Sequence, residues 1–171
     1  SKLVEELSKK HRENYQDKPI FLHVHFMDPH NPINSKNPLI SAEFKKQEID
    51  EINNSFRLAI AGKKSMEESK AQIDLYRKLY SYEVNYVAKE LNSILKNMKS
   101  LDLLDNSYVL LTADHGEYLS SKSGVLEHAG PINKAQDLER LLYKELLHVP
   151  LVFWGLGKGS VKKVSSLVDI P

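Results

Sequence analysis

Three apolar runs along the chain have the length and composition of strands inside a sheet. They cover residues 21–27, 108–112 and 149–154. Runs that are apolar on both faces suit the middle of a parallel sheet that helices cover. Helical patterns separate the runs, and the connections are long enough for right-handed crossovers. The pattern therefore predicts an α/β fold in which these strands lie in one parallel or mixed sheet flanked by helices.

The segments between the runs predict helices. A short amphipathic helix begins near Leu3, and a second is expected over residues 42–61. A capping box formed by Ser65 and Glu68 opens the longest helix, and another is expected over residues 137–147. The longest helix carries an apolar stripe in steps of four and three residues, made of Tyr80, Val84, Val87, Leu91, Ile94 and Met98.

Carboxylate and imidazole side chains follow two of the predicted strands. The stretch FLHVHFMDPHNPI ends in a turn with Asp28 and His30, and YVLLTADHGEYL carries Asp114 and His115 at the end of its run. Strand ends form the ligand crevice of an open α/β sheet, and Gly116 permits a turn there. We therefore expect His30 and the Asp114–His115 pair to converge at one edge, about 10 Å apart or closer, the scale of a small-anion site. The alternative for Asp-His-Gly is a turn with a capping Asp beside an incidental His.

Other polar residues near these runs have two interpretations each. His23 and His25 share one face of the first predicted strand. They could form a metal pair, but core histidines bonded to backbone are the favoured interpretation. Asp28 either binds and orients a ligand or forms the turn before Pro. Glu117 either supports the site or is a solvated carboxylate, and His148 is expected to be structural.

Composition excludes several classes of protein. The 171 residues suit one domain with its own core. A formal net charge of +1 gives no electrostatic case for nucleic acid or an anionic membrane. There is no membrane-length apolar stretch and no signal-peptide pattern, so a soluble, cytoplasmic protein is favoured over a secreted one. The chain has no cysteine, which excludes disulfides, thiolate metal ligands and a Cys nucleophile within it. Oligomeric state stays open.

Five blocks of sequence occur in the order seen in a known family. They are FLHVHFMDPHNP, YSYEVNYVAKELNSIL, DNSYVLLTADHGEYL, LYKELLHVPLVFWG and VSSLVDIP. The chain resembles the sulfatase branch of the alkaline phosphatase superfamily, which also includes phosphonate monoester hydrolases and phosphoglycerol transferases. The resemblance implies a three-layer sandwich with a mainly parallel sheet flanked by helices. It also implies that residues 1–171 form a single domain, the C-terminal-side part of a sulfatase-like catalytic domain.

The family's reaction is hydrolysis of a sulfate or phosphate ester at a divalent metal, which implies Mn, Zn, Ca or Mg as the cofactor. By resemblance, Asp114 and His115 are two metal ligands, and His30 contacts the sulfuryl or phosphoryl group. His128 lies where many members place a Lys or His near the leaving group. The competing interpretations are a loop histidine bonded to backbone for His30 and a solvated loop residue for His128.

The chain departs from the family pattern in the region of the nucleophile. It contains no Cys and no Ser-x-Pro-x-Arg motif. We therefore interpret it as a fragment that lacks the N-terminal nucleophile region, with the missing N-terminal half of the enzyme as its partner. We expect the metal to be weakly bound or absent in the fragment, and the fragment alone to be inactive.

The choice between sulfate and phosphate esters depends on His115, which stands where many sulfatases have Asn. Imidazole suits Mn or Zn better than Ca, and this leans toward phosphate-type chemistry. A parent sulfatase is nevertheless the first hypothesis. The alternatives are a phosphodiesterase, phosphonate monoester hydrolase or phosphoglycerol transferase, or an inactive metal- or partner-binding module. The alcohol part of the substrate has no readable motif.

Overall fold

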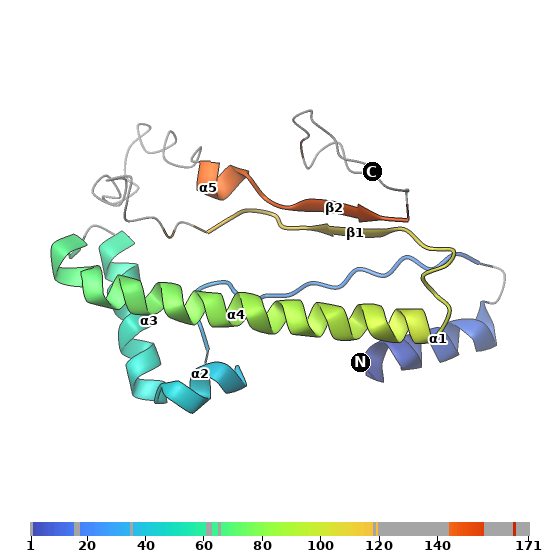
Figure 1. Ribbon diagram of the computed structural model, residues 1–171, viewed down its shortest axis with the longest axis horizontal. Helices are drawn as coiled ribbons and strands as arrows, with labels where there is room; N and C mark the ends of the chain where they lie inside the picture. The colour runs from blue at the N-terminus through green and yellow to red at the C-terminus, as the bar shows by residue number, and fades with distance from the viewer. Residues whose placement is uncertain are drawn as a thin grey trace.

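A computed structural model describes residues 2–15, 18–34, 36–60, 63–64, 66–117, 119, 144–155 and 166. Its helices are α1 (Lys2–Asn14), α2 (Pro38–Glu43), α3 (Lys46–Ile60), α4 (Met66–Ser100) and α5 (Lys144–Leu147), and its strands are β1 (Val109–Thr112) and β2 (Leu151–Trp154). Figure 1 shows α4 along the length of the molecule, with α2 and α3 near one end and α1 near the other. The strands lie on the opposite side from α2.

The hydrophobic core lies between α3 and the first half of α4. Apolar residues at helical spacing on each helix face each other, which removes both stripes from water. Phe56 and Tyr76 stack at the centre, with ring centroids 3.6 Å apart and planes 6° from parallel. The buried cluster consists of Ile33, Ile40, Ile49, Ile52, Phe56, Ala59, Ile73, Tyr76 and Leu79.

The apolar stripe predicted on α4 only partly coincides with this core. Where the structure describes burial along α4, from residue 68 onward, the buried residues are Ser69, Ile73, Tyr76, Leu79 and Glu83. Tyr80 packs against the core as a partly buried residue, whereas Val84 is 45% exposed. The rest of the predicted stripe is half-buried, because α3 covers only the N-terminal half of α4.

The helix expected over residues 42–61 is two helices, and its predicted start was wrong. Asn37 caps α2 by accepting from the Leu39 N–H at 3.0 Å, and Pro38 occupies the first turn. Phe44 then adopts an extended conformation and ends α2. The Glu48 carboxylate accepts from the Lys45 N–H at 2.7 Å, which caps the start of α3. A further helix was expected over residues 137–147, and α5 is the part of it that the structure describes.

The described residues contain a two-stranded sheet in which β1 and β2 pair antiparallel, with Leu110 opposite Phe153. The predicted three-layer sandwich with a mainly parallel sheet is therefore not confirmed. Residues 21–27 run in the same direction as β1 (Figure 1) but are not a strand. A strand needs a hydrogen-bonded neighbour, and this run has none within the described part of the chain.

The sheet side leaves large apolar side chains in solvent. Phe21 is 92% exposed and Trp154 is 56% exposed. We refer to residues 18–27, β1 and β2 together as the open sheet side. Across the part of the chain that the structure describes, no helix combines the length and apolarity needed to span a membrane.

Candidate functional site

The turn that carries His30 and the turn after β1 meet at one edge of the molecule. Residues 21–27 and β1 run in the same direction in Figure 1, and the His30 and His115 rings that follow them meet at one end. The ring centroids of His30 and His115 are 6.1 Å apart, with the planes at 71°. The expected proximity of these two side chains is therefore present, although the first of the two segments is not a strand.

Asp114 and His115 each have one side-chain atom that is available to bind a metal. The backbone N–H of His115 donates to Asp114 Oδ1 at 3.0 Å, which leaves Oδ2 available. His115 Nδ1 lies 2.7 Å from the Gly116 carbonyl oxygen. A carbonyl can only accept, so this bond places the proton on Nδ1 and leaves Nε2 unprotonated in the neutral ring. The free atoms, His115 Nε2 and Asp114 Oδ2, lie 3.9 Å apart.

The electrostatic surroundings favour the ionised form of Asp114. The hydrogen bond from the His115 N–H is the largest cause that lowers the Asp114 pKa, and the positive charges that His115 and His25 carry when protonated act in the same direction. A lowered carboxyl pKa extends toward acid the pH range of the charged carboxylate, which is the form that binds a metal.

These two donors fit a divalent metal as a ligand pair. Carboxylate oxygen and imidazole nitrogen bind such ions at about 2.0–2.2 Å, so two atoms 3.9 Å apart can share one ion after a small rotation. An imidazole that donates its other N–H to a backbone carbonyl is the usual arrangement for a metal-binding His. Among the described residues, however, no group of three or more His, Cys, Asp or Glu side chains could hold a metal. The pair supplies part of a ligand set.

His30 is positioned by a turn that closes on itself. Its backbone N–H donates to the Met27 carbonyl at 2.9 Å. Asn34 Nδ2 donates to Asp28 Oδ1 at 3.1 Å, so Asp28 serves to hold the loop together. His30 itself is exposed, and its ring is therefore accessible to a ligand at the edge.

Asparagine side chains fasten this loop to the helices. Asn31 Nδ2 donates to the Tyr76 hydroxyl at 3.2 Å. The buried Asn53 of α3 accepts from the Ile33 N–H at 3.1 Å and donates to the Ile33 carbonyl at 2.7 Å. Each contact satisfies polar groups that are shielded from water. Burial raises the pKa of Tyr76 to about 12, so this hydroxyl stays neutral under the loop.

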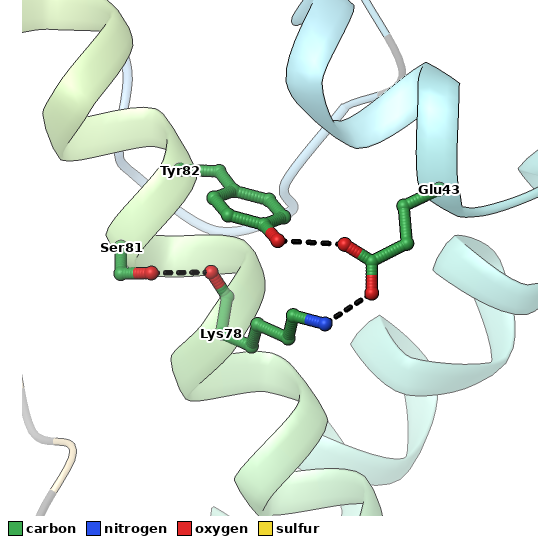
Figure 2. Close-up of polar contacts among 4 residues, drawn as sticks. All are labelled: Glu43, Lys78, Ser81 and Tyr82. Atoms are coloured by element: carbon green, nitrogen blue, oxygen red, sulfur yellow. Dashed lines mark hydrogen bonds and ion pairs between the residues drawn. The ribbon is translucent and has the colours of Figure 1, made fainter.

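The far end of the loop is held by Asn37 and by a polar cluster between α2 and α4. Asn37 Nδ2 donates to the Tyr82 carbonyl at 3.0 Å. Figure 2 shows the Glu43 carboxylate accepting from the Tyr82 hydroxyl at 2.6 Å and pairing with Lys78. The bond from Lys78 is the largest cause that lowers the Glu43 pKa. The cluster links two helices at the surface and serves the fold.

The remaining candidate residues fall in different places. His23 and His25 are exposed, with ring centroids 6.1 Å apart, so the favoured reading as core histidines was wrong. Glu117 is half-buried, and its charge contributes to raising the pKa of Tyr80, which burial raises most. His148 is exposed before β2. His128 lies outside the described residues.

The sequence analysis did not identify Asn31, Asn53 or Asn37 as residues that position the site. The signal available was the density of Asn and Pro over residues 31–38, which indicated only a loop. The bonds that these Asn side chains make depend on which helix lies beside the loop. The tertiary structure decides this, so the local sequence cannot show it.

Comparison with known proteins adds the family to this geometry. The model of the Sulfatase family matches residues 2–170. The chain belongs to the sulfatase family. No curated protein and no solved structure that was compared matches it. Membership supports a sulfatase-superfamily hydrolase and implies an alkaline phosphatase-like fold, and the family generally uses a divalent metal.

Proposed function

We propose that this sulfatase-family chain carries half of the site of an enzyme that hydrolyses sulfate esters at a divalent metal. The observation that carries the proposal is the meeting of the His30 ring with the Asp114–His115 pair, 6.1 Å between the two imidazole centroids. The residues come from two turns far apart in sequence, and the asparagine bonds to Ile33 and Tyr76 fix one of them. Such support for exposed polar groups favours a site over incidental proximity.

The proposed roles follow from the donor atoms. Asp114 Oδ2 and His115 Nε2 would hold the metal, which would supply Lewis-acid polarisation of an ester oxygen. His30 lies beside this pair and, when protonated, donates to an equatorial oxygen of the sulfuryl group. Fixed positive charge at that position stabilises the negative charge that the transition state concentrates there. His128 is proposed to assist the leaving group, as the family resemblance implies.

A nucleophile and further metal ligands must come from outside the described residues. The 171 residues contain neither Cys nor a Ser-x-Pro-x-Arg motif. The exposed apolar residues of the open sheet side, Phe21 at 92% among them, support a further polypeptide layer there. We propose that this layer is the N-terminal half of the enzyme, and that it brings the nucleophile to the edge occupied by His30.

A phosphate ester is the second candidate substrate. The free Nε2 of His115 favours it, because a nitrogen ligand suits Mn or Zn better than Ca. The phosphodiesterase, phosphonate monoester hydrolase and phosphoglycerol transferase reactions all belong to this alternative. They use the same residues of this chain.

The first test is the activity of the purified chain with aryl sulfates and phosphate diesters in the presence of Mn²⁺ or Zn²⁺. We expect no turnover above background, because removal of a covalent nucleophile costs several orders of magnitude. Metal-dependent hydrolysis that Asp114→Ala abolishes would show that this chain alone is a complete enzyme.

The second test uses the chain joined to a polypeptide that carries the nucleophile motif. We expect Asp114→Asn and His30→Ala each to lower the rate of sulfate ester hydrolysis by about 100-fold or more. The control variant His148→Ala, exposed before β2, should retain activity. Equal activity of all three variants would rule out the proposed site.

A further inference from the structure

Glu83 is a buried carboxyl that the proposed function does not use. It lies on α4 and is 1% exposed. Its Oε1 has no hydrogen-bond partner among the described residues. An unpaired buried carboxylate is costly, whereas the neutral acid is much less so. The position therefore favours a protonated side chain.

Two residues of the loop that carries His30, one at each end of the loop, interact with this carboxyl. At the far end, Asn37 Nδ2 bonds the Tyr82 carbonyl at 3.0 Å, and the Asn37 side chain also bonds Glu83. At the near end, Asp28 lies close enough for its charge to act on Glu83. Burial is the largest cause that raises the Glu83 pKa, the negative charge of Asp28 adds to it, and the Asn37 bond opposes it. Among the described residues, Asp28 is the ionisable group whose field reaches Glu83.

We propose that Glu83 is a positioning residue, which as a neutral carboxyl holds the loop from Asp28 to Asn37, and His30 with it, against α4. Loss of its proton would place a second negative charge near Asp28 in a poorly solvated space. The two carboxylates would repel each other, and the loop that contains Asp28 would move away from α4. The importance of this movement for the reaction rests on the proposed function, because it displaces His30 from the Asp114–His115 pair.

The test follows Glu83 and the loop together by NMR in the full chain, labelled with ¹³C and ¹⁵N. We expect the Glu83 carboxyl carbon to titrate with a midpoint above the ordinary glutamate value. The backbone amide signals of Asn31 and Ile33 should shift with that same midpoint. Both residues belong to the loop and have no titrating side chain, so a common midpoint reports movement of the loop.

Two variants separate positioning from general stability. Glu83→Gln, a neutral isostere, should remove the shared transition. Above the Glu83 midpoint, its Asn31 and Ile33 amide signals should stay at the positions that the unsubstituted chain shows below that midpoint. Glu90→Gln lies two helical turns further along α4 and should leave the transition unchanged.

A Glu83 midpoint at or below the ordinary value, or loop amides that move with a different midpoint, would overturn the proposal. Persistence of the transition in Glu83→Gln would do the same. If Glu83→Gln does not fold, the two midpoints in the unsubstituted chain decide the question alone. No turnover is read in this experiment, so its outcome is independent of whether the chain contributes to a sulfatase reaction.

Discussion

The helical body, which consists of α2, α3 and the first half of α4 with the loop over residues 28–37, differs sharply from the open sheet side. In the helical body the aromatic residues Phe56 and Tyr76 are at most 1% exposed. On the open sheet side Phe153 is 48% exposed and Trp154 is 56% exposed. Side chains of the same kind are therefore buried in one region and solvated in the other. The candidate site lies between them, with His30 held by the helical body and Asp114 and His115 following β1.

The contrast between the two regions shows which part of the candidate site is held in place by contacts within this chain. The loop that carries His30 bonds to α4 through half-buried Asn31 and to α3 through buried Asn53, so its position follows from the helical core. The turn with Asp114 and His115 is held by local bonds within residues 114–116 and by the Gly116 N–H, which donates to the Leu146 carbonyl at 2.7 Å. We infer that the turn with Asp114 and His115 depends more on a covering layer than the His30 loop does.

The largest expected difference between the regions comes from truncating one phenylalanine in each. Phe56→Ala removes a ring that is 1% exposed and stacked on Tyr76, so it should lower the free energy of unfolding by about 3–5 kcal/mol. Phe153→Ala, at 48% exposure, should change it by about 0.5 kcal/mol. Denaturant unfolding measures both. Equal losses would mean that the open sheet side is packed in the isolated chain, contrary to this account.

A smaller difference is expected between two neighbouring asparagines of α3. Asn53→Ala leaves the buried N–H and carbonyl of Ile33 without partners, which should cost about 1–3 kcal/mol of unfolding free energy. Its control is Asn54→Ala, because exposed Asn54 only accepts from Arg57. It should change stability by less than about 0.5 kcal/mol. If the two variants are equally stable, the loop is not fastened through Asn53.

The smallest expected effect concerns the Glu43 cluster in Figure 2. Because the Glu43 pKa is lowered in the folded chain, its contribution is present above the ordinary carboxyl range and is lost as the pH falls through the lowered value. Glu43→Gln should therefore lower the melting temperature slightly at neutral pH and leave it unchanged in strong acid. Thermal unfolding at the two pH values measures this, with exposed Glu51→Gln as the control. If Glu43→Gln lowered the melting temperature by the same amount at both pH values, the result would contradict an ion pair made by ionised Glu43.

The sequence predicted those features that depend on local pattern. The meeting of His30 with the Asp114–His115 turn followed from two apolar runs that end in Asp and His. The existence of α1, α3 and α4 followed from helical spacing. The parallel sheet did not follow. Among the described residues, residues 21–27 have no neighbouring strand, and β2 pairs antiparallel with β1 alone. The burial of Glu83 could not be predicted either, since charged side chains are ordinarily exposed and burial depends on which segments pack against α4.

Metal binding tests the central claim, that one edge of this chain forms half of a divalent-metal site. Titration of the ¹⁵N-labelled chain with Mn²⁺ broadens NMR signals near the bound ion and locates it directly. We expect weak binding that broadens Asp114 and His115 first and His30 next, that spares the Glu43–Lys78–Tyr82 cluster, and that His115→Ala removes. Calorimetric titration with Zn²⁺ should show the same loss in that variant. Broadening centred on His148 or on the His23–His25 pair instead, or undiminished in His115→Ala, would contradict the account.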